Sequence, residues 1–139
     1  MKIDPIKNGL VIDHIDAGNG MKIYNFLNLS ELDCTVALIK NVPSRKTGKK
    51  DIIKIDADIK LDLDVLGYIA PEVTVNVIKN GTTIEKKKLE LPQTLKNVIR
   101  CKNPRCITSV EQGIDQEFKL VDKENKVYRC IYCESKAND

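Results

Sequence analysis

Residues 101–106 read Cys-Lys-Asn-Pro-Arg-Cys and residues 130–133 read Cys-Ile-Tyr-Cys, and these two stretches decide how the C-terminal part of the chain folds. The first is a C-x4-C pair and the second is a C-x2-C pair. Two short-spaced cysteine pairs brought together make a tetrahedral cage of four sulfur atoms, which suits Zn²⁺. The spacing therefore predicts one zinc ion per chain, with the ligands Cys101, Cys106, Cys130 and Cys133.

The segment around these cysteines is too small to be held folded by its own apolar core. It spans roughly 40 residues, and domains of that size usually need a metal ion or disulfide bonds. Structural zinc contributes about 10–16 kcal/mol of apparent binding free energy in small modules. Because cysteine fills all four ligand positions, none stays open for a substrate, so we predict a structural metal ion.

Other roles of the four cysteines stay open on spacing alone. The chain opens with Met1-Lys2-Ile3-Asp4, without an apolar signal segment, and no stretch approaches a membrane span, so we expect a reducing cytoplasm and no disulfides. A redox dithiol is disfavoured because residues 130–133 continue a strand-like run, whereas such motifs lie at a helix start. Iron also accepts four thiolates, so zinc is favoured over iron without being proved.

The composition bounds the number of domains and the kind of partner. A chain of 139 residues has room for a domain of about 90 residues plus the metal module, and we place the two at residues 1–92 and 93–139. A net charge of +3, with 31% charged residues of both signs, gives only a mild bias toward anionic partners. Four tyrosines, two phenylalanines and no tryptophan leave few platforms for stacking exposed bases.

The N-terminal part alternates between strand-like and helix-like segments. Runs rich in β-branched residues predict strands at residues 10–15, 35–39, 51–56 and 73–78, with a loop over 41–50 between the second and the third. Apolar residues at helical spacing predict one helix carrying Met21 through Leu32 and another over 61–69, which Pro71 stops. The order β-α-β-β-α-β predicts an α+β fold.

Two split βαβ halves of this kind make a ferredoxin-like sandwich, in which both helices cover one face of an antiparallel sheet. An extra strand at 83–89 is expected to run back from the Asn80-Gly81 turn. The C-terminal metal-binding domain is predicted to be small, all-β and similar to a zinc ribbon.

One face of the predicted sheet is left open and carries polar residues. The period of two turns Ile53 and Ile55 toward the helices and Lys54 away from them. The same alternation exposes Asn76, while Asp13 and His14 lie on the first strand, which is central in this fold. An amide, a carboxylate and cationic groups together suit a nucleotide. The alternative is that these are ordinary solvated surface groups.

Several sequence strings run in order across nearly the whole chain. They are Gly9-x-Val11-Ile12-Asp13-His14-Ile15, Pro43-Ser44 followed by Gly48-x-Lys50-Asp51-x-Ile53-Lys54-Ile55, Ala70-Pro71-x-x-Thr74-Val75-Asn76-x-Ile78, and the two cysteine pairs. Together they resemble the regulatory chain of bacterial and archaeal aspartate carbamoyltransferase. The Val-Ile-Asp-His-Ile string and the cysteine spacing are the most specific parts of this resemblance.

The resemblance implies a non-catalytic, cytoplasmic regulatory subunit of pyrimidine biosynthesis. Its N-terminal domain would bind the nucleotide effectors CTP, UTP and ATP, and its zinc domain would dock onto a separate catalytic chain. The family assembly is two catalytic trimers joined by three regulatory dimers, so self-association as a dimer is implied as well. By position in the matched strings, the effector site would comprise Ile6, Val11, Asp13, His14, Lys50, Lys54, Asn76, Ile78 and, less securely, Lys86.

Two other classes of function were weighed against this one. A zinc-ribbon protein that binds nucleic acid would place Lys96, Arg100, Lys102 and Arg105 on phosphates. A self-contained enzyme would need convergent acid, base or nucleophilic groups, but His14 is the sole histidine and the cage takes four of the five cysteines. We therefore expect no catalytic residues, no nucleic-acid polymer as partner and no membrane association.

Overall fold

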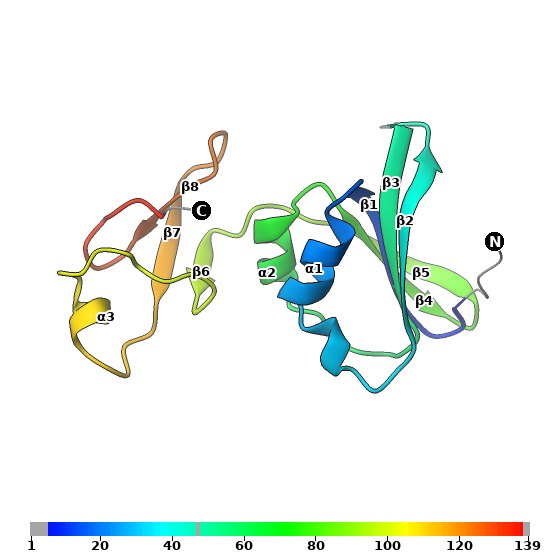
Figure 1. Ribbon diagram of the computed structural model, residues 1–139, viewed down its shortest axis with the longest axis horizontal. Coiled ribbons are helices and arrows are strands. Elements are labelled where there is room, and N and C mark those ends of the chain that lie inside the picture. The colour runs from blue at the N-terminus through cyan, green and yellow to red at the C-terminus, as the bar shows by residue number, and fades with distance from the viewer. Residues whose placement is uncertain (1–5, 47, 138–139) are drawn as a thin grey trace. The chain divides into compact units, whose positions relative to one another are not determined.

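The computed structural model describes residues 6–46 and 48–137 and is drawn in Figure 1. The chain divides between Glu90 and Leu91 into two compact units, each with its own sheet. The opening residues Met1–Asp4, which carry the expectation about a signal segment, lie outside the described residues. Within the described ranges, no helix has the length and apolar character needed to cross a membrane.

The first unit is a five-stranded sheet with short helices. Its elements are β1 (Gly9–Asp16), α1 (Gly20–Phe26), the 3-10 helix η1 (Leu29–Glu31), β2 (Val36–Ser44), β3 (Gly48–Ile55), α2 (Leu63–Ile69), β4 (Thr74–Lys79) and β5 (Thr82–Lys88). The strand order is β2-β3-β1-β4-β5, and every neighbouring pair is antiparallel. This is the ferredoxin-like order with one added strand, so the predicted fold class is confirmed.

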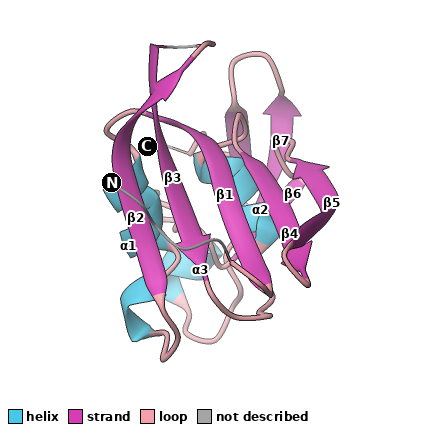
Figure 2. Cartoon of the chain, turned by 90° about the vertical axis from the view of Figure 1, so that its right-hand side faces the viewer, coloured by secondary structure: helices cyan, strands magenta, loops and turns pink. Residues whose placement is uncertain are grey.

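The core of the first unit lies between the sheet and the helices. Figure 2 shows the sheet in front, with α1 and α2 behind it. Ile12, Ile53 and Ile55 are fully buried on the helix side, where they pack with Ile23 and Leu66 from the helices. Among the described elements, the helices lie on one face of the sheet and none lies on the other, the open face.

A β-bulge interrupts β1 near its middle. Ile12 and Ile15 both point into the core although they are three residues apart, and the register with β3 shifts between them. The extra residue is accommodated by His14, whose φ of 60° lies in the left-handed region. The bulge keeps both Asp13 and His14 out of the core, which a regular strand would do for only one of two consecutive residues.

The predicted loop over residues 41–50 is wrong. β2 continues to Ser44 and β3 already begins at Gly48, so Pro43 pairs with Lys49 inside the ladder. A proline is tolerated there because β2 is the edge strand of the sheet. The two strands bend through a register shift between Ile39 and Val42.

The two helices are shorter than the apolar pattern indicates. α1 ends at Phe26 because Asn28 takes a left-handed backbone conformation, and η1 then continues separately. α2 begins after Asp62, whose carboxylate accepts hydrogen bonds from the backbone N–H groups of Asp64 and Val65. Helices of seven residues are unstable alone, so both depend on packing against the sheet.

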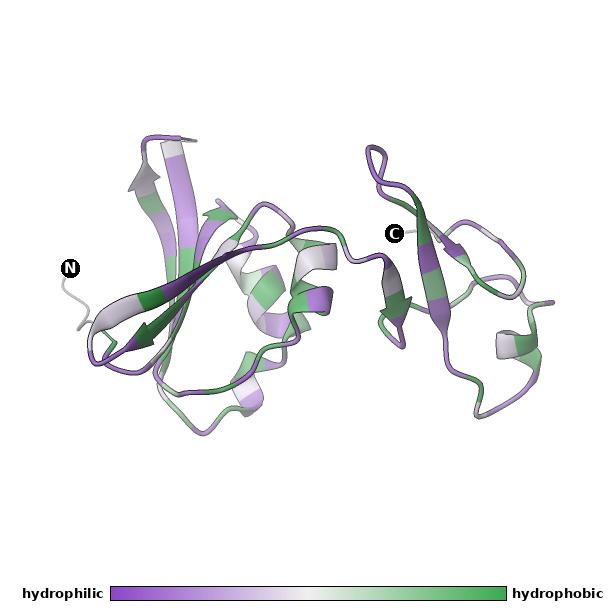
Figure 3. Ribbon diagram, turned by 180° about the vertical axis from the view of Figure 1, so that it is seen from behind, coloured by the Kyte–Doolittle hydropathy of each residue, from purple (hydrophilic) through white to green (hydrophobic). Residues whose placement is uncertain are grey.

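The second unit is a small β-structure. It contains β6 (Thr94–Lys96), the four-residue helix α3 (Ile107–Val110), β7 (Glu117–Asp122) and β8 (Val127–Cys130), with the strand order β6-β7-β8. Figure 3 shows hydrophobic and hydrophilic residues alternating along β7. Among residues 91–137, the large apolar side chains with as little as 1% exposure are those of Leu95, Phe118 and Tyr128, so the apolar core of this unit is small.

Candidate functional site

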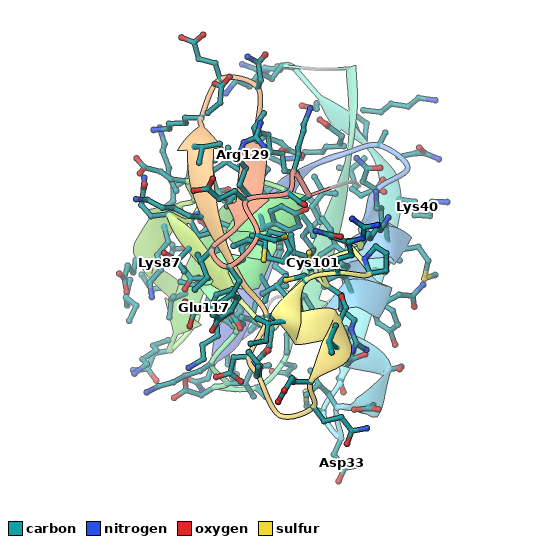
Figure 4. All side chains as sticks on the ribbon, turned by 90° about the vertical axis from the view of Figure 1, so that its left-hand side faces the viewer. Asp33, Lys40, Lys87, Cys101, Glu117 and Arg129 are labelled. Carbon is teal, nitrogen blue, oxygen red and sulfur yellow. The ribbon has the colours of Figure 1, made fainter. Side chains whose placement is uncertain are left out.

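The second unit brings the four predicted metal ligands together. Cys106 precedes α3 and Cys130 ends β8, while Cys101 and Cys133 lie in the loops before and after them. Figure 4 labels Cys101, and the four Sγ atoms lie within 4.8 Å of one another. The Cys101–Cys133 and Cys106–Cys130 Sγ distances are 3.5 and 3.7 Å. Zinc–sulfur bonds of about 2.3 Å in a tetrahedron require sulfur atoms about 3.8 Å apart, so the cluster fits a single structural zinc ion.

The four thiols differ in acidity because their surroundings differ. The Ser135 hydroxyl and backbone N–H lower the pKa of Cys133 to about 6, and the same two groups of Thr108 lower the pKa of Cys106. Burial raises the pKa of Cys101 to about 12 and also raises that of Cys130. A metal ion needs all four as thiolates, so its binding must displace the protons that Cys101 and Cys130 hold.

A buried amide that sequence reasoning missed holds the first cysteine in place. Gln116 is 9% exposed, and its side-chain oxygen accepts a hydrogen bond of 2.9 Å from the backbone N–H of Cys101. The Gln116 N–H in turn donates to the side-chain oxygen of Asn97. Its place directly before β7 gave no signal, because a glutamine next to a strand is usually solvated.

The first unit places four predicted residues in one row across its open face. Lys54 on β3 pairs with Val11 on β1, Val11 pairs with Asn76 on β4, and Asn76 pairs with Lys86 on β5. Paired residues of antiparallel strands point to the same side of a sheet. Two lysines and an amide therefore flank an apolar side chain on the face opposite the helices.

Next to this row, the bulge residues of β1 are already engaged with neighbours. The Lys50 ammonium lies 2.9 Å from the Asp13 carboxylate, and both side chains are 18% exposed. Burial alone would raise the pKa of Asp13, but hydrogen bonds from Lys50 and from the His14 N–H outweigh it and lower that pKa. His14 Nδ1 lies 2.9 Å from the hydroxyl of Thr74, which is buried.

The remaining predicted residues lie at the start of β1. Ile78 pairs with Gly9, two positions along from Asn76, and Ile6 is buried with 8% exposure. The Ile6 side chain comes within 3.0 Å of the point where a Cβ at Gly9 would stand, and the Ile55 carbonyl oxygen is 2.0 Å from it. Any larger residue at position 9 would push these groups apart.

A hollow with a volume of about 470 Å³ lies beside His14. Its charged or titratable lining residues are His14, Lys46, Lys86 and Lys88 together with the acidic residues Asp16 and Glu72. Lys88 pairs with Thr74 and therefore shares the open face with Lys86. Thr74 and Lys88 were absent from the predicted site, although the alternation along β4 and β5 already placed them on the same face as Asn76 and Lys86.

One buried polar atom of this face has no partner. The side-chain oxygen of Asn76 is out of contact with solvent and accepts no hydrogen bond within the described residues. A buried carbonyl without a donor is unfavourable by about 1–3 kcal/mol. Its position between two lysines fits a binding site whose ligand supplies the missing hydrogen-bond donor.

One of the basic residues of the second unit that the nucleic-acid alternative would use is paired with an acidic residue. The Lys96 ammonium lies 3.4 Å from the Asp115 carboxylate. The Asn97 amide and Lys96 together lower the pKa of Asp115, so this carboxylate stays charged beside the lysine. One of the four predicted phosphate contacts is thus partly neutralised.

A ferredoxin-like domain with an open polar face and a four-cysteine domain together define a two-domain protein that binds a structural metal ion. Residues 1–90 match the family model of the aspartate carbamoyltransferase regulatory chain, allosteric domain, and residues 93–139 match its metal binding domain. The chain belongs to the family of aspartate carbamoyltransferase regulatory chains. It is therefore a non-catalytic regulatory chain, as the sequence predicted.

Relatives named aspartate carbamoyltransferase regulatory chain match over nearly their full length. The one from Clostridium botulinum is 59% identical over 134 residues, which cover 96% of this chain and 92% of the relative. The one from Clostridium acetobutylicum is 52% identical over the same shares. The one from Bifidobacterium longum is 45% identical and covers 99% of both chains.

Proposed function

We propose that the open face of the first unit binds nucleoside triphosphate effectors, with CTP, UTP and ATP as candidates. The single observation that carries this proposal is the row Lys54–Val11–Asn76–Lys86, with the unpartnered Asn76 oxygen at its centre. A base that donates a hydrogen bond would satisfy that oxygen, and the apolar side chain would pack against the base. The lysines would meet the phosphate charge.

The other predicted residues have matching roles in this proposal. Lys50 would turn from the Asp13 carboxylate toward a phosphate, or would keep that carboxylate oriented toward a ribose hydroxyl. The hollow beside His14, where three lysines outnumber two carboxylates, has room for a phosphate chain. Ile6 and Ile78 would close the apolar end of the site, toward Gly9.

The second unit would connect this site to catalysis on another chain. We assign effector binding to residues 1–92 and contact with the catalytic chain of aspartate carbamoyltransferase to residues 93–139. The proposed assembly is two catalytic trimers held together by three regulatory dimers. Each nucleotide would shift the assembly by its differential affinity for two quaternary states, typically by about 1–3 kcal/mol. A cytoplasmic location remains a prediction, for which reduced metal-binding cysteines give the chemical reason.

Replacing Lys54 with alanine is expected to weaken triphosphate binding several-fold or more, because an ammonium group facing the phosphates is lost. Isothermal titration calorimetry of the full chain with CTP and ATP measures this. Lys79→Ala is the matched control, since Lys79 lies on β4 but lines a groove on the helix side of the sheet. Unchanged affinity in Lys54→Ala, or an equal loss in Lys79→Ala, would refute the assigned face.

Replacing Asn76 with valine is expected to separate binding from stability. The substitution removes a buried carbonyl that has no partner, so the free energy of unfolding should stay the same or rise. Nucleotide affinity should fall, because the atom that reads the base is gone. Urea unfolding followed by circular dichroism, together with calorimetry, tests both parts. A variant that is less stable but binds as tightly would show that Asn76 has a structural role instead.

A further inference from the structure

The two cysteine pairs share a feature that lies beyond the four ligands. The second cysteine of each pair is followed two positions later by a hydroxyl residue, in Cys106-Ile107-Thr108 and in Cys133-Glu134-Ser135. In both places the hydroxyl residue donates its backbone N–H and its side-chain O–H to the sulfur atom of the cysteine. Cys101 and Cys130 receive backbone N–H groups instead.

The hydroxyl of Thr108 is held in a buried position. Thr108 is 6% exposed, and its Oγ1 donates to Cys106 Sγ over 3.2 Å. Among the described residues of the second unit, Thr108 and Gln116 are the two buried polar residues, and both hold a cysteine of the cluster. The side-chain polar groups of both residues therefore make hydrogen bonds to cysteines of the metal site.

The hydroxyl of Ser135 is oriented by a second residue. The Asn103 amide donates to Ser135 Oγ over 3.4 Å and also contributes a hydrogen bond to Cys133. The Ser135 carbonyl oxygen accepts from the backbone N–H of Cys130 over 3.0 Å. Ser135 therefore contacts both cysteines of the C-x2-C pair, Cys130 through its backbone carbonyl and Cys133 through its hydroxyl.

The electrostatics of the cluster explain why such donors matter. Four thiolates and one divalent cation leave a net charge of −2 in a partly buried place, which is unfavourable unless polar groups offset it. Neutral O–H and N–H donors lower the free energy of the sulfur anions and fix their directions. The hydroxyl groups add to the backbone N–H groups, which any residue at the same position would provide.

We propose that the hydroxyl groups of Thr108 and Ser135 set how tightly the four-cysteine cluster holds its metal ion. Both are positioning residues that act through Cys106 and Cys133 and do not contact the ion. In the sequence, this role corresponds to a threonine or serine two positions after the second cysteine of each pair. The inference is independent of the proposed effector site, because it concerns the metal-binding unit alone.

The test is the zinc affinity of the full chain in competition with a coloured chelator at one fixed pH. Thr108→Val keeps the shape and the backbone N–H but removes the hydroxyl, and Ser135→Ala does the same for the second sulfur. Each is expected to weaken zinc binding about 10- to 100-fold, as loss of outer hydrogen bonds to metal ligands commonly does. Thr108→Ser restores the hydroxyl and should bind zinc nearly as tightly as the unsubstituted chain.

Ser109→Ala is the matched control. Ser109 lies beside Thr108 on the same short helix, but its exposed hydroxyl donates to the Asn103 carbonyl oxygen over 2.8 Å and not to sulfur. Its zinc affinity should therefore be unchanged. Unchanged affinity in both Thr108→Val and Ser135→Ala would overturn the proposal, and so would an equal loss in Ser109→Ala, which would indicate general loosening of α3.

A spectroscopic measurement separates a direct effect on sulfur from misfolding. With Co²⁺ in place of Zn²⁺, the variants should keep the visible bands of a tetrahedral site, because the four ligands remain. Their thiolate-to-cobalt charge-transfer band should move to lower energy, because a thiolate with one hydrogen bond fewer gives up electron density more easily. An unmoved band in both variants would contradict the proposal. If Thr108→Val takes up no metal at all, the partly exposed Ser135 decides the matter.

Discussion

Replacing Cys106 with alanine is expected to unfold residues 91–137 while the first unit stays folded. The second unit has a small apolar core, so most of its stability must come from the metal ion. Structural zinc contributes about 10–16 kcal/mol of binding free energy to such modules, and the loss of one ligand removes a large part of it. Removing the ion from the unsubstituted chain with a strong chelator should have the same effect.

Hydrogen exchange followed by mass spectrometry measures this unit by unit. Amides after Leu91 should lose protection, and those of β1, β3 and β4 should keep theirs. Cys34→Ala is the control, because this cysteine lies in the first unit and outside the cluster. Persistent protection after the metal is gone would contradict a metal-dependent fold, and joint unfolding of both units would contradict their independence.

The same variant tests the proposed assembly. Mixed with catalytic trimers of aspartate carbamoyltransferase, the unsubstituted chain should form a larger complex in size-exclusion chromatography, and Cys106→Ala should not. The variant should still bind CTP or ATP, since the effector site lies in the other unit. Failure of the unsubstituted chain to form a complex would count against the proposed partner, without bearing on the metal site.

Replacing Asp51 with alanine is expected to destabilise the first unit by about 3 kcal/mol or more, because several backbone donors would be left without an acceptor. The Asp51 side chain is fully buried, and it accepts hydrogen bonds from the N–H groups of Gly18, Gly20 and Asn41 at 3.1, 2.9 and 3.0 Å. It thereby ties the turn before α1 and the bend in β2 to β3. Urea unfolding with circular dichroism measures the loss.

Two further substitutions sharpen this test. Asp51→Asn keeps the shape but offers one acceptor atom fewer, so it should be destabilised by a smaller amount, about 1–3 kcal/mol. Asp62→Asn is the control, because the Asp62 carboxylate caps α2 at an exposed position and asparagine caps equally well. An Asp51→Ala variant as stable as the control would show that water replaces the carboxylate without loss.

The stability of the first unit should also depend on pH because of the Asp51 carboxylate. Burial alone would raise the pKa of Asp51, but the three backbone hydrogen bonds outweigh it and hold that pKa below the ordinary value of 3.8. Because this pKa is lower in the folded state, the ionised carboxylate adds to the free energy of unfolding at pH values above the unfolded pKa. This contribution is lost as the pH falls below 3.8 toward the folded pKa. As the pH is lowered through this range, the free energy of unfolding should therefore fall less steeply for Asp51→Asn than for the unsubstituted chain.

The sequence predicted the fold where local chemistry and periodicity agree. Alternation along β3 and β4 assigned Ile53, Val75 and Lys54 to their correct faces, because the period of two is a property of any strand. It failed between residues 41 and 50, where Pro43 and Gly48 were interpreted as loop formers. Pro43 can belong to a strand because β2 lies at the edge of the sheet, and Gly48 pairs with Ser44 at the start of β3; no local pattern reveals either fact.

The predicted open-face residues were located by two different arguments. Alternation turned Lys54, Thr74, Asn76 and Ile78 outward, whereas the family resemblance assigned Ile6, Val11, Lys50, Ile78 and Lys86 to the effector site. The contact of Thr74 with His14 depends on which strands are neighbours and on the bulge at His14. Lys88 follows Lys86 by two positions on β5, so alternation alone places both on one face, and the register adds only the pairing of Lys88 with Thr74.

The amino-acid sequence by itself indicated a division into two parts, the strand and helix order of the first unit and the four cysteines that cluster in the second. These follow from spacing along the chain, since ligand chemistry and strand periodicity act over a few residues. Only the tertiary structure decided which distant groups meet: the Asp51 carboxylate with three N–H donors, and the Gln116 side-chain oxygen with the Cys101 N–H. It also decided that the Asn76 oxygen meets no donor within the described residues. Such contacts depend on sheet register, on bulges and on the closing of loops around a metal ion, because a shift of one residue would separate the same groups.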